Sequence, residues 1–164
     1  MKPADAEALY AAIDVSRESL RRRMRWVCGV TAVEDCLKFI LECRTSQVYG
    51  IFESKTGGMV GIVSIGRRKD SAASGWFSGW IRSDKGKKGY FSDSGTLAIR
   101  QAFRKYGMHR LYARIDPNNR PARKALQKLG FRYEGCLRRD KLLHGLWINQ
   151  ECWGLLKSEW KNKA

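Results

Sequence analysis

The sequence of 164 residues predicts an α+β domain, in which helices cover both faces of a mixed, mostly antiparallel sheet. Three features lead to this class. Apolar residues recur at helical spacing through the first 42 residues, and two alternating runs joined by a glycine-containing turn follow, as in a hairpin. Residues 109–135 then contain a strand, a helix and the start of another strand.

The amino-terminal region is expected to form three helices. The first covers residues 5–14, and Ser16 is the expected N-cap of the second. A capping box from Thr31 to Glu34 opens the third. The apolar residues of the three helices are Leu9 and Ile13, then Leu20 and Met24, then Cys36, Leu37, Ile40 and Leu41.

The middle of the chain is predicted to form a hairpin followed by a further strand. Strands at residues 47–53 and 59–65 are joined by a turn at residues 55–58, which contains two glycines. Residues 74–81 form the next strand, and residues 86–89 form a basic loop.

A helix is expected to follow this loop, with Asp93 or Ser94 as its N-cap and its end near Tyr106. Its spacing predicts four inward-facing residues, which are Leu97, Ala98, Gln101 and Ala102.

The best-defined elements lie after this helix. Residues 109–116 alternate as a strand, and Pro117 breaks it. An amphipathic helix follows and stops at Gly130, because glycine adopts the left-handed C-cap at least cost. The last strand covers residues 146–156. Leu111, Ala113 and Ile115 lie on one face of the strand, and the apolar residues of the amphipathic helix are Ala122, Ala125, Leu126 and Leu129.

Charge is the unusual feature of the composition. The net charge is +16, from 32 Lys and Arg against 16 acids, so the chain attracts anions. Three interpretations stay open: a polyanionic cofactor with an acidic or ribosome-associated partner, nucleic-acid contact, and a solvated basic surface. Nucleic acid is not favoured, because no recognised binding module is present. The basic clusters are Arg21–Arg23 with Arg25, Arg67–Lys69, Lys85–Lys88, and Arg138, Arg139 and Lys141.

Several classes of protein are not favoured by the sequence. No apolar run is long enough to span a membrane, and residues 1–7 lack the apolar segment of a secretory signal. The five cysteines contain no C-x-x-C pair, which favours buried thiols in a reducing cytoplasm over a metal site. A cytoplasmic protein without a metal is therefore expected.

Several segments together resemble one family. Lys128-Leu129-Gly130-Phe131 closes the helix described above, Tyr133-Glu134-Gly135-Cys136-Leu137-Arg138 resembles an F-x-x-E-G-x-x-R signature, and Leu155–Trp160 resembles L-L-x-x-E-W. These motifs are similar to those of the GNAT N-acetyltransferases, in the RimJ/RimL branch that acetylates N-terminal amines of ribosomal proteins. The resemblance covers nearly the whole chain, so residues 1–164 are expected to be a single GNAT domain.

The resemblance implies an acetyl-coenzyme A site. In this family, backbone N–H groups at a helix N-terminus hold the pyrophosphate in a [Q/R]-x-x-G-x-[G/A] loop, which is an anion site formed by the backbone and the helix dipole. Residues 86–91 occupy that place here. The implied cofactor-binding residues are Trp80, Ile81, Arg82, Lys87, Lys88, Gly89, Tyr90, Phe91, Asn119 and Ala122.

The chain departs from the family pattern at several positions. Gly86 replaces Arg or Gln, although Lys85 and Lys87 keep the loop positive. Phe91 replaces a small residue, and its ring is expected to crowd the phosphates. Ala122 replaces a serine whose hydroxyl can protonate the leaving thiolate. The remaining changes are Ser92-Asp93-Ser94 for T-E-A, Asn149 for aspartate and Trp153 for tyrosine. The family's first strand is also missing or reduced to a stub.

The implied reaction is direct attack of a primary amine on the thioester, with backbone N–H groups near Trp80 and Ile81 polarising the carbonyl. Glu134 and Glu151 are candidate bases, and a bound water is an equally good one. His109 is expected to pack and His144 to be exposed. The alternative is a catalytically impaired GNAT-fold protein that binds a partner or nucleic acid.

The aromatic side chains leave a further question open. Sheet core is the favoured role, and an apolar acceptor pocket or a homodimer surface is the alternative. The residues concerned are Trp76, Phe77, Trp80, Trp147 and Trp153.

Overall fold

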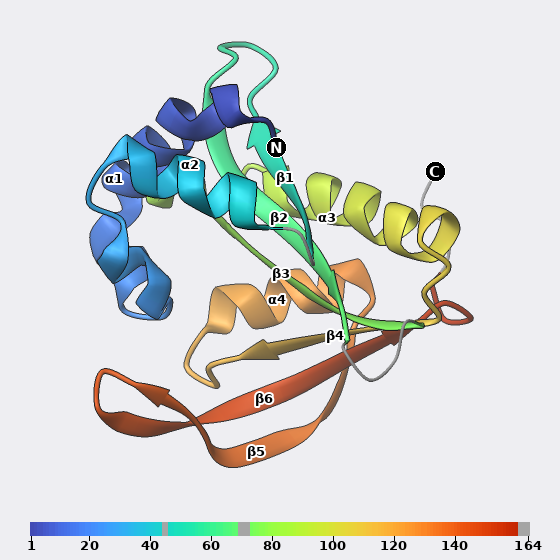
Figure 1. Cartoon of the computed structure of the whole chain (residues 1–164). Coiled ribbons are helices and arrows are strands. Elements are labelled where there is room, and N and C mark those ends of the chain that lie inside the picture. The colour runs from blue at the N-terminus through green and yellow to red at the C-terminus, as the bar shows by residue number, and fades with distance from the viewer. Residues whose placement is uncertain (44–45, 69–72, 161–164) are drawn as a thin grey trace. The chain divides into compact units, whose positions relative to one another are not determined.

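The computed structural model describes residues 1–43, 46–68 and 73–160 (Figure 1). The helices are α1 (Ala6–Arg21), α2 (Val33–Glu42), α3 (Tyr90–Arg100) and α4 (Arg120–Leu129), and the strands are β1 (Ser46–Phe52), β2 (Met59–Arg67), β3 (Ser74–Ile81), β4 (Arg110–Ile115), β5 (Arg132–Leu143) and β6 (Leu146–Leu156). Short 3-10 turns cover Pro3–Asp5, Arg25–Gly29 and Ser83–Lys85, and α3 continues as one π-helical turn at Gln101–Lys105.

The strands within the described residues form one sheet in the order β1-β2-β3-β4-β6-β5. β3 pairs with β4 in parallel, whereas β6 pairs antiparallel with both β4 and β5. The predicted α+β class with a mixed sheet is therefore confirmed. No strand precedes α1 in residues 1–43, and β1 lies at the edge of the sheet, which agrees with the expected loss of the first strand.

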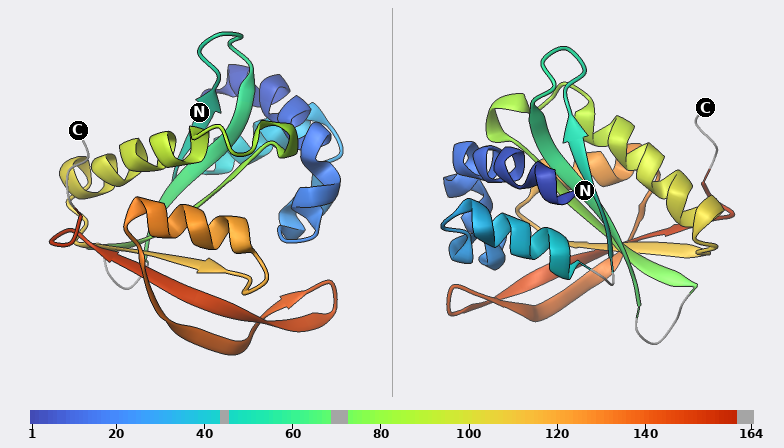
Figure 2. Two further views of the ribbon diagram at one scale, coloured as in Figure 1. Left: turned by 180° about the vertical axis from the view of Figure 1, so that it is seen from behind. Right: turned by 45° about the horizontal axis from the view of Figure 1, so that its top comes forward.

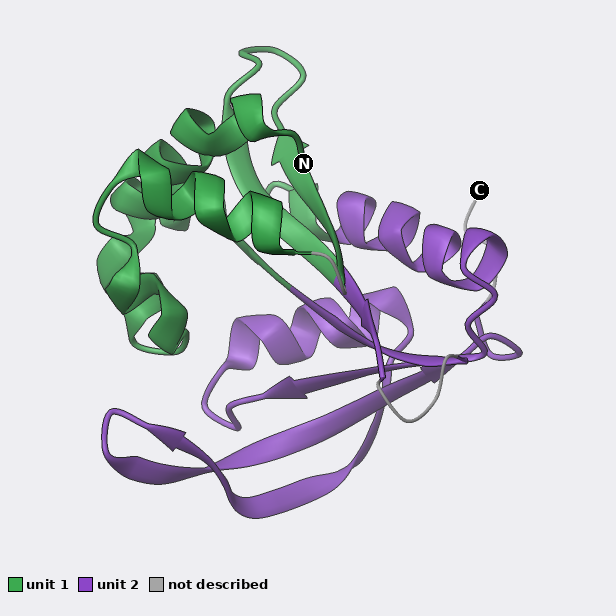
Figure 3. Ribbon diagram, in the orientation of Figure 1, with its two compact units in different colours: residues 1–64, 79–91 green, residues 65–78, 92–164 purple. Residues whose placement is uncertain are grey.

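The chain divides into two compact units (Figure 3). Unit 1 comprises residues 1–64 and 79–91, and unit 2 comprises residues 65–78 and 92–164. Within unit 1, α1 and α2 lie side by side, and their apolar faces share a core with residues of β2 and the end of β3 (Figure 2). The buried residues of that core include Leu9, Ile13, Val27, Cys36, Ile62 and Trp80.

The first two predicted helices are one continuous helix, α1. Leu9, Ile13 and Leu20 are buried along a single stripe, as the spacing predicts. Ser16 does not cap a second helix, because it lies buried inside α1, where its hydroxyl accepts a hydrogen bond from the backbone of Ser83. A serine at a helix start and a serine serving a tertiary contact look alike in sequence.

The start of α2 is also displaced from the prediction. Asp35, rather than Glu34, closes the cap, because its carboxylate accepts from the backbone N–H groups of Thr31 and Ala32. These bonds lower the pKa of Asp35, with the bond from Thr31 the largest cause. Leu41, one of the apolar residues of this expected helix, is exposed.

Helix α3 begins at Tyr90, three residues before Asp93, the earlier of the two predicted caps. Leu97 and Gln101 are exposed, which contradicts their expected inward orientation, whereas Ala98 and Ala102 are buried. The buried stripe adds Gly95, Ile99 and Phe103, so its members follow the i, i+3, i+4, i+7 and i+8 spacing of a helix.

The predictions for residues 109–156 hold best. Leu111, Ala113, Leu126 and Leu129 are buried, and Gly130 ends α4 with a φ of 95°, in the left-handed region. Strand β6 has the predicted bounds.

The aromatic residues divide between core and surface. Phe77 and Trp153 are buried in unit 2, where their rings contact Phe131 and Tyr133, and Trp80 is buried in unit 1. Trp147 is 60% exposed, so the core role does not extend to it.

Candidate active site

Eight of the ten predicted cofactor residues lie at the end of β3, in the loop that joins β3 to α3, or at the start of α3, and these eight belong to unit 1. After Ile81, the backbone N–H of Arg82 donates to Val60, and the 3-10 turn Ser83–Lys85 follows. The loop then reaches α3 through two residues in the left-handed region, Lys87 with φ of 65° and Gly89 with φ of 85°.

This path places the loop at the beginning of a helix. The first N–H groups of a helix have no partner within it, and the helix dipole adds partial positive charge there. Lys87 and Lys88 are exposed beside those groups. The local chemistry therefore suits an anion such as a pyrophosphate.

The side chain of Arg82 is held by Asp84. Nε and Nη2 of the guanidinium donate to the two carboxylate oxygens at 3.0 and 2.8 Å, and Nη1 lies 3.4 Å from the carbonyl of Met59. The hydrogen bonds from Arg82 lower the pKa of Asp84. Arg82 therefore stabilises the turn before the loop, in addition to any role toward a ligand.

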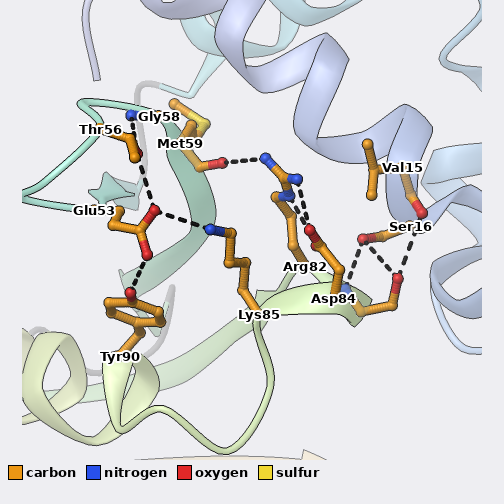
Figure 4. Close-up of polar contacts among 11 residues, drawn as sticks. Val15, Ser16, Glu53, Thr56, Gly58, Met59, Arg82, Asp84, Lys85 and Tyr90 are labelled. Carbon is orange, nitrogen blue, oxygen red and sulfur yellow. Dashed lines mark hydrogen bonds and ion pairs between the residues drawn. The ribbon is translucent and has the colours of Figure 1, made fainter.

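Glu53 is a contact of this loop that the sequence did not reveal (Figure 4). Its carboxylate accepts from the hydroxyl of Tyr90, from Lys85 Nζ at 2.9 Å and from Thr56 Oγ1 at 2.9 Å. These bonds, that of Tyr90 foremost, lower the pKa of Glu53 to about 2. The same contact raises the pKa of Tyr90.

Ser16 provides a second contact to the loop from α1 (Figure 4). The backbone N–H of Ser83 donates to Ser16 Oγ at 2.9 Å, and Ser83 Oγ lies 3.4 Å from the carbonyl of Val15. Neither contact has a local sequence signal, because the partners are 67 and 68 residues apart.

Phe91, the bulky departure from the family pattern, packs toward β3. A Cβ atom placed on Gly79 would lie 2.8 Å from Cε2 of the Phe91 ring, and 2.5 Å from the carbonyl oxygen of Ile62. Glycine at position 79 therefore makes room both for strand β2 and for this ring. At least one edge of the ring lies against the sheet.

The two remaining cofactor residues lie in unit 2. Asn119 is the N-cap of α4, and its Oδ1 accepts from the backbone N–H of Ala122 at 3.3 Å. Ala122 is partly buried and carries no hydroxyl. The structure thus brings the predicted residues from Trp80 to Phe91 together in one unit, and Asn119 with Ala122 in the other.

The two candidate bases are both held by arginines of unit 2. Glu134 accepts from Arg110 through both oxygens at 2.6 Å, and this pairing lowers its pKa. Glu151 is buried and accepts from Arg123 Nη2 at 2.5 Å, from Arg123 Nε at 3.2 Å and from Trp153 Nε1 at 3.0 Å. The lowered pKa makes the Glu134 carboxylate a poorer proton acceptor.

The histidines have different surroundings. His109 is exposed rather than packed, and its Nδ1 lies 2.9 Å from the carbonyl of Ala73. His144 is exposed in the turn between β5 and β6, as expected, with a φ of 49°.

The cysteines only partly follow the prediction of buried thiols. Cys36 is buried, and burial raises its pKa to about 11, whereas Cys28 and Cys136 are exposed. Across the described residues, no group of three or more His, Cys, Asp or Glu side chains could hold a metal ion. No helix within the same residues is long and apolar enough to cross a membrane. Lys69 of the predicted basic cluster lies outside the described residues.

Comparison with known families supports the motif-based resemblance. Residues 1–132 match a family model described as an acetyltransferase (GNAT) domain. The probable N-acetyltransferase YjcK of Bacillus subtilis (strain 168) is 26% identical over 113 residues, which is 68% of this chain. The chain covers 62% of the length of that relative, which is less than two thirds.

Solved structures show the same fold. RimL, the ribosomal L7/L12 α-N-protein acetyltransferase solved with coenzyme A, superposes with a TM-score of 0.86 at 18% identity, over 95% of this chain and 90% of that one. RimJ of Mycobacterium smegmatis gives 0.84 at 24% identity, over 97% of this chain and 80% of that one. At these identities the likeness establishes the architecture, which is the predicted GNAT fold.

Proposed function

Because the chain belongs to the GNAT acetyltransferase family, we propose that it transfers an acetyl group from acetyl-coenzyme A to a primary amine, either a protein N-terminus or a small amine. The observation that carries the proposal is the loop at residues 86–91. It joins β3 to the first turn of α3, passes through two left-handed residues and carries exposed lysines. Similar proteins were solved with acetyl-coenzyme A or coenzyme A bound.

The proposed reaction is a direct attack. The amine nitrogen bonds to the thioester carbonyl carbon, the carbon–sulfur bond breaks, and the coenzyme leaves as a thiolate. Backbone N–H groups near Trp80 and Ile81, at the end of β3, would polarise the carbonyl as negative charge develops on its oxygen.

Proton transfer in this reaction is assigned to water. An amine is mostly protonated at neutral pH, so it must lose a proton before it attacks. Glu134 and Glu151 are engaged by Arg110 and Arg123, so we assign this proton to a bound water that passes it on to solvent. Ala122 cannot protonate the thiolate, so solvent supplies that proton as well.

The charge of the chain indicates what kind of acceptor it meets. A net charge of +16 raises the encounter rate with acidic partners and lowers it with basic ones. An acidic or ribosome-associated acceptor therefore fits better than a basic one.

The proposal is tested by measuring free thiol released from acetyl-coenzyme A in the presence of candidate amines. The panel contains acidic and basic peptides with free N-termini, the same peptides with blocked N-termini, and small primary amines. We expect release that depends on a free amine and is fastest with an acidic peptide. Release no faster than background hydrolysis with every acceptor, from folded protein, would refute transferase activity for this panel and favour the second candidate.

The second candidate is a GNAT-fold protein that acts by binding a partner. Phe91 and Ala122 favour it, because one is bulky at a loop that normally carries a small residue and the other lacks a hydroxyl. Phe91→Ala distinguishes the two. If the wild-type protein binds no coenzyme A and the variant does, the loop keeps its phosphate geometry and the ring blocks it.

A further inference from the structure

Two segments that are distant in sequence, the β1–β2 hairpin and the connection from β3 to α3, meet at the carboxylate of Glu53 (Figure 4). Glu53 follows β1 at the start of the hairpin turn, Lys85 ends the 3-10 turn after β3, and Tyr90 is the first residue of α3. Lys85 and Tyr90 are separated by the four loop residues 86–89. One carboxylate therefore contacts the residues on both sides of residues 86–89, which form most of the candidate phosphate loop (residues 86–91).

The side chain of Glu53, which we call the anchor of the loop, is itself held firmly in place. The side chain of Glu53 is only 12% exposed. Its backbone N–H donates to the carbonyl of Gly58 at 2.9 Å, and its carbonyl accepts from the N–H of Gly57 at 2.8 Å. Thr56 Oγ1 donates to the carboxylate from the same turn. The position of the carboxylate is thus fixed by the hairpin, before the loop contributes anything.

The loop between the two contacts needs such support. Lys87 adopts a left-handed φ of 65°, a conformation that is strained for a residue with a side chain. Gly86 and Gly89 add conformational freedom in the same segment. Joining the ends to one anchor reduces the entropy that the segment loses when it orders around a ligand.

The charges around the loop also favour a structural role for the contact between Glu53 and Lys85. The ammonium group of Lys85 forms an ion pair with Glu53 and is therefore already occupied. Attraction of an anion is left to the N–H groups of the loop and to the exposed Lys87 and Lys88. The hydrogen bonds hold the pKa of Glu53 at about 2, so it remains charged at physiological pH.

We propose that Glu53 is a positioning residue of the phosphate loop: by binding Lys85 and Tyr90 it orders residues 86–89 so that their N–H groups are ready to receive the pyrophosphate of coenzyme A. This inference rests on the proposed function. It assigns to the β1–β2 hairpin a part in cofactor binding, although Glu53 need not touch the cofactor.

A competing role for Glu53 makes the opposite prediction. A carboxylate that only competes with the phosphates for Lys85 would oppose binding, and its removal would tighten the complex. Glu53→Gln and Glu53→Ala therefore decide between the two roles by the direction of the change.

Calorimetric titration with coenzyme A provides the first measurement. We expect the dissociation constant to rise roughly tenfold in Glu53→Ala, and less in Glu53→Gln, which keeps an acceptor for Tyr90. Titration with pantetheine, which lacks the pyrophosphate, should be unchanged. The matched control is Glu18→Gln, since it changes the net charge equally in the same unit but breaks an exposed pair with Arg22 on α1.

Hydrogen exchange in the free protein provides the second measurement and needs no ligand. We expect faster exchange of the N–H groups of residues 86–90 in both Glu53 variants, with β2 and α1 unchanged and Glu18→Gln like the wild type. Binding and exchange equal to those of Glu18→Gln would overturn the role of Glu53, as would tighter binding. If the wild-type protein binds no coenzyme A, the proposed function fails, and this inference fails with it whatever the exchange shows.

Discussion

Replacing Gly79 by alanine tests the packing beneath the candidate site. An added Cβ would lie 2.5 Å from the carbonyl oxygen of Ile62, 2.8 Å from the Phe91 ring and 3.1 Å from Cα of Val63. Two of these three atoms belong to the backbone of β2, which cannot turn aside as a side chain can. We therefore expect Gly79→Ala to be destabilising.

The magnitude follows from two opposing effects. Overpacking a well-packed site costs about 1–3 kcal/mol. Replacing glycine returns about 0.4–1 kcal/mol, because alanine has less freedom in the unfolded chain. The net loss in the free energy of unfolding should be about 1–2 kcal/mol.

Urea denaturation measures this change, and two variants sharpen it. Gly29→Ala is the control, since its Cβ meets no atom within 4 Å, and it should be neutral or slightly stabilising. Phe91→Ala in the Gly79→Ala background should recover only part of the loss, because the backbone contacts remain. If Gly79→Ala is as stable as the wild type, the described packing of β2, β3 and Phe91 is wrong.

Three further predictions concern ionised groups. The stability that Glu53 contributes relative to Glu53→Gln should be complete above the ordinary pKa of 4.5 and should disappear as pH falls toward about 2, because the folded-state pKa of Glu53 is lowered. Urea denaturation of both proteins at several pH values measures this difference in stability, and a difference that does not change with pH would contradict the prediction. Gly154→Ala should displace the Glu134 carboxylate and weaken its pair with Arg110, which lies 2.7 Å from the added Cβ, with a loss of about 1 kcal/mol; an unchanged urea midpoint would count against it. Glu151→Gln should lower the melting temperature while leaving the pH profile of acetyl transfer unchanged, and loss of the acidic limb of that profile, on which the rate falls at low pH, would instead identify Glu151 as the base.

The sequence predicted best where local chemistry decides the structure. The end of helix α4 was predicted, because a left-handed glycine, Gly130, follows its last residue; in the structure the amide oxygen of Asn119 caps the other end. Both signals lie within the helix and its neighbours, so they can be read from the sequence. The alternation of residue types that defines β4 is equally local.

The candidate site was predicted less completely because its contacts are not local. Glu53 is 32 residues from Lys85 and 37 from Tyr90, and an acid in a hairpin turn gives no sign of such partners. The prediction that Ser16 is an N-cap was wrong for the same reason, because its hydroxyl accepts a hydrogen bond from the backbone N–H of Ser83. Glu134 and Glu151 looked available as bases because the arginines that pair with them lie 24 and 28 residues away.

The start of α3 shows a further limit. Asp93 and Ser94 are good capping residues, yet the helix already begins at Tyr90, three residues earlier. Tyr90 is held by Glu53, which is a tertiary contact that capping preferences cannot include. The difference matters for function, because it moves the helix N-terminus next to Gly89 and the candidate phosphate loop.

Calorimetric titration of the wild-type protein with acetyl-coenzyme A tests the central claim most directly, once the protein has been shown to contain no co-purified coenzyme. We predict binding at micromolar affinity that is lost with acetyl-pantetheine, which lacks the pyrophosphate. Absence of binding at millimolar acetyl-coenzyme A, with folded protein confirmed, would contradict the claim that residues 86–91 form a phosphate loop.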